Sequence, residues 1–170
     1  MKTKVVFKKG RYVKTRAGAE VIKIAKSISK ALKPLTYQQE IAGSIRRKSL
    51  KPVDVDIVVI PKSKRKIVEH MNRKGKYLQG GDKRVSFNIK GVKVEIYFAT
   101  KKSLGAHLMT YTGPFQYNIG LRMLAKRKGY LLNQYGLFNR KSNKYLAGTT
   151  EKSIYKALGK KYKEPELRGK

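Results

Sequence analysis

Two aspartates one residue apart are the side chains in this sequence best suited to chemistry. Asp54 and Asp56 alternate with Val53, Val55 and Ile57. Successive side chains of a strand point to opposite faces, so this alternation predicts both carboxylates on one face and the apolar side chains on the other. Neighbouring carboxylates repel each other unless a cation lies between them. The spacing therefore predicts a divalent-metal site on a strand.

A third carboxylate lies on a later predicted strand. Residues 85–89 and 92–98 both alternate between apolar and polar types, which predicts a β-hairpin. If its second strand lies beside the aspartate strand, Glu95 faces Asp54 and Asp56. Mg²⁺ prefers oxygen ligands and keeps several waters, so three carboxylates suffice for two ions about 3.5–4 Å apart, with Mn²⁺ as a substitute.

A Gly-Ser turn precedes the aspartates. Gly43 and Ser44 are followed by two arginines, and residues 44–49 are predicted to form a short helix. The turn's backbone N–H groups, the Ser44 hydroxyl and the forked guanidinium of Arg47 suit the β- and γ-phosphates of a nucleoside triphosphate. Such a turn before a metal site predicts nucleotidyl transfer, in which a hydroxyl attacks the α-phosphorus and pyrophosphate leaves. The alternative is that the aspartates are salt-bridged surface groups on an edge strand, which leaves the Gly-Ser turn unexplained.

The apolar pattern predicts the elements that position these side chains. Steps of three and four residues indicate helices at 16–33, 64–73, 103–110, 115–128 and 150–158. Alternation and turn residues indicate strands at 38–42, 53–60, 85–89 and 92–98, short strands within 130–147, a strand or arm within 1–14 and a loop at 75–81. Together they predict an α+β fold, in which a mixed or antiparallel sheet backed by helices precedes a small α+β lobe. A seam near 105–112 divides the chain into domains at 1–108 and 109–170.

The charge balance points to a polyanionic partner. Forty-two Lys and Arg residues face ten Asp and Glu residues, so the net charge is +32. The basic residues are spread between patterned apolar positions, which indicates a folded protein with nucleic acid as its first candidate partner. No apolar run approaches the ~18 residues of a membrane-spanning helix, so we expect no membrane partner. The sequence has no cysteine, which excludes a disulfide framework and a thiolate zinc site.

Five segments resemble a known family. GSIRR, DVDIVVI and VEIYFA resemble the palm of the nucleotidyltransferase superfamily, which includes the family X DNA polymerases. LGAHLMTYTGPFQYNIGLRMLAKRKGYLLNQYGLF and TTEKSIYKALGKKYKEPELR are similar to the C-terminal part of family X and narrow the match. The resemblance covers about residues 17–168 and leaves out the family's N-terminal lyase and fingers regions, as in its minimal viral members. It implies a nucleotidyltransferase palm followed by a thumb-like lobe.

The resemblance also implies roles for individual residues. Asp54, Asp56 and Glu95 match the catalytic, metal-binding triad, whose third member is usually Asp in the family. Thr110 replaces the Tyr of the family's Tyr-Phe pair. The residues that match positions around the bound nucleotide are Gly43, Ser44, Arg47, Thr110, Tyr111, Gly113 and Asn118.

DNA contacts are expected on the helix predicted at 115–128. Arg122 matches a residue that touches the template strand, and Lys126 and Arg127 on the same helix are available to DNA phosphates. We therefore predict a monomeric, template-directed DNA polymerase that adds dNTPs to a primer 3′-OH and fills short gaps in repair. We expect an intracellular location, either the cytoplasm or, if the source is viral, the virion, because no signal peptide is recognisable.

Two alternatives remain open at this point. One is a template-independent nucleotidyltransferase that acts on RNA or protein. The other is a non-catalytic, basic DNA-binding protein with a degenerate palm.

Overall fold

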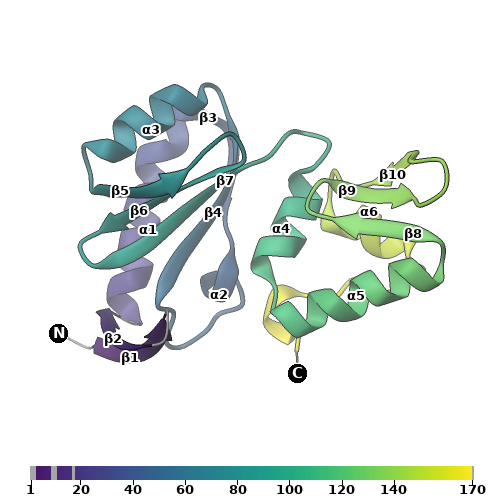
Figure 1. The fold of residues 1–170 in the computed structure, drawn as a ribbon, viewed down its shortest axis with the longest axis horizontal. Coiled ribbons are helices and arrows are strands. Elements are labelled where there is room, and N and C mark those ends of the chain that lie inside the picture. Colours follow the sequence, from purple (N-terminus) through teal and green to yellow (C-terminus); the bar gives the residue numbers. More distant parts are fainter. Residues whose placement is uncertain (1–2, 9–10, 17, 170) are drawn as a thin grey trace.

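The computed structural model describes residues 3–8, 11–16 and 18–169, which form two lobes lying side by side (Figure 1). The N-terminal lobe is built on a five-stranded sheet, and the C-terminal lobe combines helices with a three-stranded sheet. This architecture confirms the predicted α+β fold. No helix in the described part of the chain is both long and apolar enough to cross a bilayer.

The large sheet is mixed, which is one of the two arrangements predicted. Its strands lie in the order β3-β4-β7-β6-β5, with β4 and β7 parallel and the other neighbours antiparallel. The parallel register places Asp56 opposite Glu95, so the expected pairing of the two strands is confirmed. The strand bounds are Thr36–Ile41 for β3, Asp54–Pro61 for β4, Lys76–Gly80 for β5, Arg84–Ile89 for β6 and Val92–Phe98 for β7.

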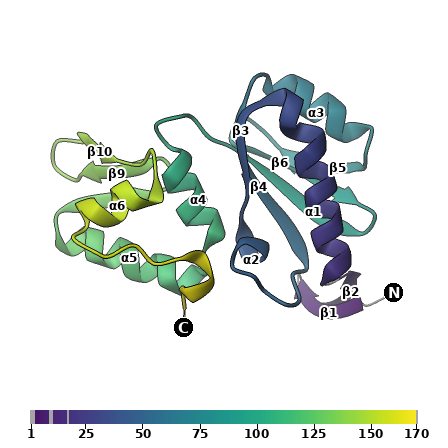
Figure 2. The ribbon, with the colours of Figure 1, turned by 180° about the vertical axis from the view of Figure 1, so that it is seen from behind.

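Two helices cover one face of this sheet. Helices α1 (Ala19–Leu32) and α3 (Lys64–Asn72) lie on the face seen in Figure 2. Val55, Ile57 and Ile96 are fully buried in the core between this face and the helices. Because side chains alternate along β4, the two aspartates lie on the opposite face. The apolar alternation thus positions the carboxylates by burying their neighbours.

Helix α4 (Leu104–Thr112) packs against the aspartate face and joins the two lobes. Its Leu104 and Leu108 pack in one buried cluster with Val58 of β4, whereas its Met109 belongs to the core of the C-terminal lobe. The predicted domain boundary at 108/109 lies inside this helix. One helix therefore contributes to the packing of both lobes.

The rest of the C-terminal lobe follows the predicted order. The C-terminal end includes a short 3-10 turn at Pro165–Leu167. Thr150 caps α6 by accepting a hydrogen bond from the Ser153 backbone N–H at 3.1 Å. The remaining elements are α5 (Phe115–Arg127), β8 (Tyr130–Asn133), β9 (Gly136–Asn139), β10 (Tyr145–Ala147) and α6 (Glu151–Ala157).

The prediction of a loop at 75–81 was wrong, because Lys76–Gly80 form strand β5. All five residues of β5 are exposed at the edge of the sheet, so no buried alternation marks the strand in the sequence. Near the N-terminus, Thr3–Lys8 (β1) and Arg11–Arg16 (β2) form an antiparallel hairpin. Residues 1–2 and 9–10 of the predicted strand or arm lie outside the described residues.

A buried group of charges also ties the lobes together. Arg46 at the end of α2 (Gly43–Arg46) donates to Glu151 of α6 at 2.8 Å and to the Thr112 hydroxyl at 2.9 Å. Arg168 donates to the other carboxylate oxygen of Glu151 at 2.8 Å. Although burial opposes it, the hydrogen bonds from these two arginines hold the pKa of Glu151 below its usual range. The charge on Glu151 thus depends on a residue from each lobe.

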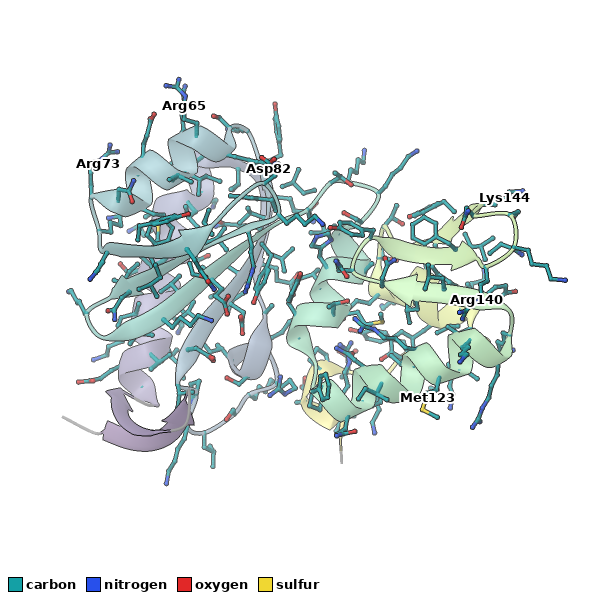
Figure 3. All side chains as sticks on the ribbon, in the orientation of Figure 1. Arg65, Arg73, Asp82, Met123, Arg140 and Lys144 are labelled. Carbon is teal, nitrogen blue, oxygen red and sulfur yellow. The ribbon has the colours of Figure 1, made fainter. Side chains whose placement is uncertain are left out.

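We expect Arg46→Ala to lower the free energy of unfolding by about 2–4 kcal/mol, because it leaves a buried carboxylate with one cationic partner. The matched control is Arg65→Ala, which removes an exposed pair with Glu69 (3.3 Å) on α3, where Arg65 projects outward (Figure 3). That change should alter the free energy by less than about 0.5 kcal/mol. Urea titrations of both variants provide the measurement. Equal midpoints would mean that the buried group adds nothing to stability.

Candidate active site

A cavity of about 500 Å³ lies between the aspartate face of the sheet and the C-terminal lobe. It brings together most of the residues singled out in the sequence, from β4, α2, α4, α5 and the turn between the last two. The predicted site residues that line it are Gly43, Ser44, Arg47, Asp54, Asp56, Thr110, Tyr111, Gly113, Asn118 and Arg122. Glu95, Lys126 and Arg127 are not among its lining residues.

Gly43 and Asp56 are in direct contact. The backbone of Gly43 has φ +63°, and a Cβ built on it would overlap Oδ2 of Asp56. The preceding Ala42 donates its backbone N–H to the Asp56 carbonyl at 2.7 Å. A side chain at residue 43 is therefore excluded both by its backbone conformation and by the carboxylate. The Gly-Ser turn and the aspartate strand form one packed unit.

Asp56 carries its charge in an unfavourable environment. Burial, followed by the nearby charges of Asp54 and Glu95, raises its pKa to about 7. One hydrogen bond opposes this shift, donated by the Tyr97 hydroxyl to Oδ1 at 3.1 Å. No ion pair among the described residues involves Asp54 or Asp56. Carboxylate oxygens without a cationic partner are suitable ligands for a divalent metal ion.

Glu95 lies on the neighbouring strand, but its carboxylate is bonded to other groups. Oε1 accepts hydrogen bonds from Arg84 and Ser86, and Oε2 accepts one from Lys93 at 2.6 Å. Although burial opposes it, Lys93 and Arg84 hold the pKa of Glu95 below its usual range. Within the described residues, no group of three His, Asp or Glu side chains is placed to hold a metal ion. The metal role of Glu95 stays a prediction.

Tyr97 is a site residue that the sequence analysis missed. Its ring stacks on Tyr111 of α4, with centroids 3.5 Å apart, while its hydroxyl bonds to Asp56. Burial, followed by the nearby carboxylates, raises the pKa of Tyr97, so the phenol keeps its proton and remains a donor. The signal was present in the sequence, because Tyr97 shares a strand face with Glu95. Tyr97 links the aspartate strand to the C-terminal lobe.

Two polar side chains of the cavity are held by backbone carbonyls of α4. The Arg47 guanidinium donates to the Thr112 carbonyl, and burial lowers its pKa while the two aspartates oppose the shift. Asn118 donates its side-chain N–H to the Thr110 carbonyl at 2.8 Å. Its Oδ1 is buried without a hydrogen-bond partner. Arg47 therefore supplies positive charge near the aspartates. Asn118 supplies an amide group whose orientation is fixed by its hydrogen bond to Thr110.

The three residues predicted to contact DNA all lie exposed on α5, but at different places. Arg122 lines the cavity. Lys126 and Arg127 lie at the C-terminal end of the helix, and Arg127 lines a separate groove. The helix therefore presents a basic surface that extends from the cavity outward.

Comparisons with known proteins agree with this architecture. Residues 107–169 match the family model described as the DNA polymerase beta thumb. The chain is 32% identical over 137 residues to Repair DNA polymerase X of African swine fever virus, a match that covers 74% of this chain and 78% of the viral protein. It is 38% identical over 76 residues to DNA polymerase IV of Saccharomyces cerevisiae, covering 45% of this chain and 13% of the yeast protein.

A solved structure shows the same fold. Leishmania infantum polymerase beta, in a ternary P/T complex, superposes with a TM-score of 0.76 at 22% identity, covering 89% of this chain and 75% of that chain. The viral match spans most of both proteins, and the family resemblance found in the sequence is thereby confirmed. The chain belongs to family X of the DNA polymerases.

Proposed function

We propose that this polymerase is template-directed, adds dNTPs to a primer 3′-OH as a monomer and fills short gaps during DNA repair. The observation that carries the proposal is the cavity itself, which is lined by an arginine, a serine, an asparagine and two carboxylates that form no ion pair among the described residues. The name of the viral relative, Repair DNA polymerase X, supports the assignment to repair.

Of the three carboxylates predicted to bind Mg²⁺, two are suited to do so and one is not. Asp54 and Asp56 offer oxygen ligands, and the pKa of Asp56 is raised because burial and the charges of Asp54 and Glu95 outweigh the Tyr97 hydrogen bond and the charge of Lys93. Glu95 fits only if its carboxylate leaves Arg84 and Lys93. When bound, two such ions lower the pKa of the primer hydroxyl and neutralise the leaving pyrophosphate.

The chain's own residues would bind and orient the nucleotide. We assign the β- and γ-phosphates to the Ser44 hydroxyl and the Arg47 guanidinium, because a guanidinium forms paired hydrogen bonds with phosphate oxygens. We assign the sugar to Tyr111 and Gly113 and the edge of the base to Asn118, because all three residues line the cavity. In the reaction the primer 3′-oxygen bonds to the α-phosphorus, and the bond from this phosphorus to the leaving pyrophosphate breaks.

DNA would bind through its phosphates to the basic surface of α5. Arg122, Lys126 and Arg127 are exposed there, on a chain with net charge +32. Binding of this kind releases counterions, so the affinity should fall steeply with salt.

We expect Asp54→Ala and Asp56→Ala each to reduce primer extension on gapped DNA in Mg²⁺ by at least about 10³-fold, because each removes a carboxylate proposed to hold the metal ions that neutralise the reacting phosphates. DNA affinity should stay within about threefold, since the phosphates bind to the basic surface. Asp82→Ala is the matched control, because Asp82 lies at the exposed turn before β6, outside the cavity (Figure 3). Gel-based extension and fluorescence anisotropy give the two readouts.

Normal extension by Asp54→Ala and Asp56→Ala would contradict the metal-site proposal. Extension without a template would instead favour a template-independent nucleotidyltransferase.

The pH dependence of stability tests the charge on Asp56 directly. The folded protein keeps this proton to about pH 7, whereas an unfolded chain releases it near pH ~4. The folded state then binds more protons between these values, so the free energy of unfolding falls as pH rises through the window. In Asp56→Asn this loss is absent. The free energy of unfolding of Asp56→Asn, relative to that of the wild type, should therefore rise by about 2–4 kcal/mol as pH increases from 4 to 7. Above pH ~7 the difference should stay constant.

Urea titrations between pH 4 and pH 8 without divalent cations measure this difference. Added Mg²⁺ at pH 8 should stabilise the wild type more than Asp56→Asn, because the cation offsets a charge that the variant lacks. A difference that stays constant from pH 4 to pH 8 would refute the buried charge on Asp56.

A further inference from the structure

Phe115 is a large apolar side chain that borders the cavity but is not packed into a core. Its exposed fraction is 73%, and it is the first residue of α5. Of the large hydrophobic side chains that are strongly exposed in the described part of the chain, it alone lines the candidate active site. Its ring therefore lies at the rim of the space where the nucleotide would bind.

The position of this ring follows from the helix on which it lies. Residues three, four and seven apart share one face of a helix. Phe115, Asn118, Ile119 and Arg122 have this spacing, and all four line the cavity. The stripe thus places an aromatic ring one turn away from the Asn118 amide, whose position is fixed by its bond to Thr110.

The other aromatic rings of the cavity are less available. Tyr97 and Tyr111 stack on each other at an interplanar angle of 15°, so each covers one face of the other. Within the described residues, Phe115 takes part in none of the ring contacts or cation–π contacts. Its ring faces are left for a ligand.

A nucleobase has the two features that this stripe complements, a flat π-face and a polar edge. We propose that Phe115 stacks on the base of the incoming nucleotide while Asn118 contacts its edge, and that the ring thereby favours purines over pyrimidines. The inference rests on the proposed function, because the phosphates bound at Ser44 and Arg47 orient the base toward α5. Stacking of a base on an aromatic side chain contributes by area rather than by hydrogen-bond pattern, so larger bases gain more.

The test is nucleotide binding to the complex of the full chain with gapped DNA, whose primer is dideoxy-terminated so that no chemistry follows. In Mg²⁺, Phe115→Ala should weaken dATP and dGTP about 10- to 100-fold and dCTP and dTTP less. Phe115→Tyr, which keeps the ring, should stay within about threefold of the wild type for all four. The base-free probe is 2′-deoxyribose 5′-triphosphate, and its affinity should be the same in Phe115→Ala and wild type.

Met123→Ala is the matched control. Met123 is also exposed on α5, with an exposed fraction of 52%. It lines the separate groove that Arg127 also lines, and it projects away from the cavity (Figure 3). This variant should bind every triphosphate as the wild type does. Thermal unfolding of Phe115→Ala should match the wild type, because the side chain is mostly exposed.

Several outcomes would overturn the inference. An equal loss for the base-free triphosphate would mean that the ring shapes the cavity without stacking. Unchanged affinity for all four dNTPs would mean that the ring contacts no nucleotide, and a loss confined to DNA affinity would assign it to a template or primer base. Failure of the proposed function has a different signature, since the wild type itself would then neither bind dNTPs nor extend primers.

Discussion

The contact between Gly43 and the carboxylate of Asp56 joins the two halves of the candidate site. It brings the turn that precedes Arg47 against the strand that carries the aspartates, with no space for a side chain between them. The apolar side chains on the other face of β4 hold the strand from behind, because they are buried against the helices of the N-terminal lobe. The spacing between the Gly-Ser turn and the carboxylates is therefore set by packing, and it does not depend on a flexible loop.

Charge distribution distinguishes the aspartates from the other partly buried acids. Glu95 has Arg84 and Lys93 as partners, and Glu151 has Arg46 and Arg168. In a chain with net charge +32, Asp54 and Asp56 nevertheless have no ion pair among the described residues. Glu95 and Glu151 are thus neutralised by side chains, whereas the role proposed for the aspartate pair is to bind an external cation.

The sequence predicted the features that depend on local periodicity. Alternation at Asp54 and Asp56 identified the strand and its polar face, because one face of β4 is buried and the pattern is therefore strict. Strand β5 was missed because an exposed edge strand imposes no such pattern. The cationic partners of Glu95 were missed for another reason: Arg84 reaches it across a strand pair, and a rotamer choice decides which way the carboxylate turns.

Arg46 and Arg47 are adjacent in the chain but bind to different parts of the C-terminal lobe. Arg46 bonds to α6 and to the Thr112 hydroxyl, while Arg47 bonds to the Thr112 carbonyl. Rotating one lobe against the other would therefore pull on the same short turn to which we assign the triphosphate. In the proposed function, the angle between the lobes and the position of the phosphate ligands are therefore coupled, so binding of a charged nucleotide would change the arrangement of the lobes.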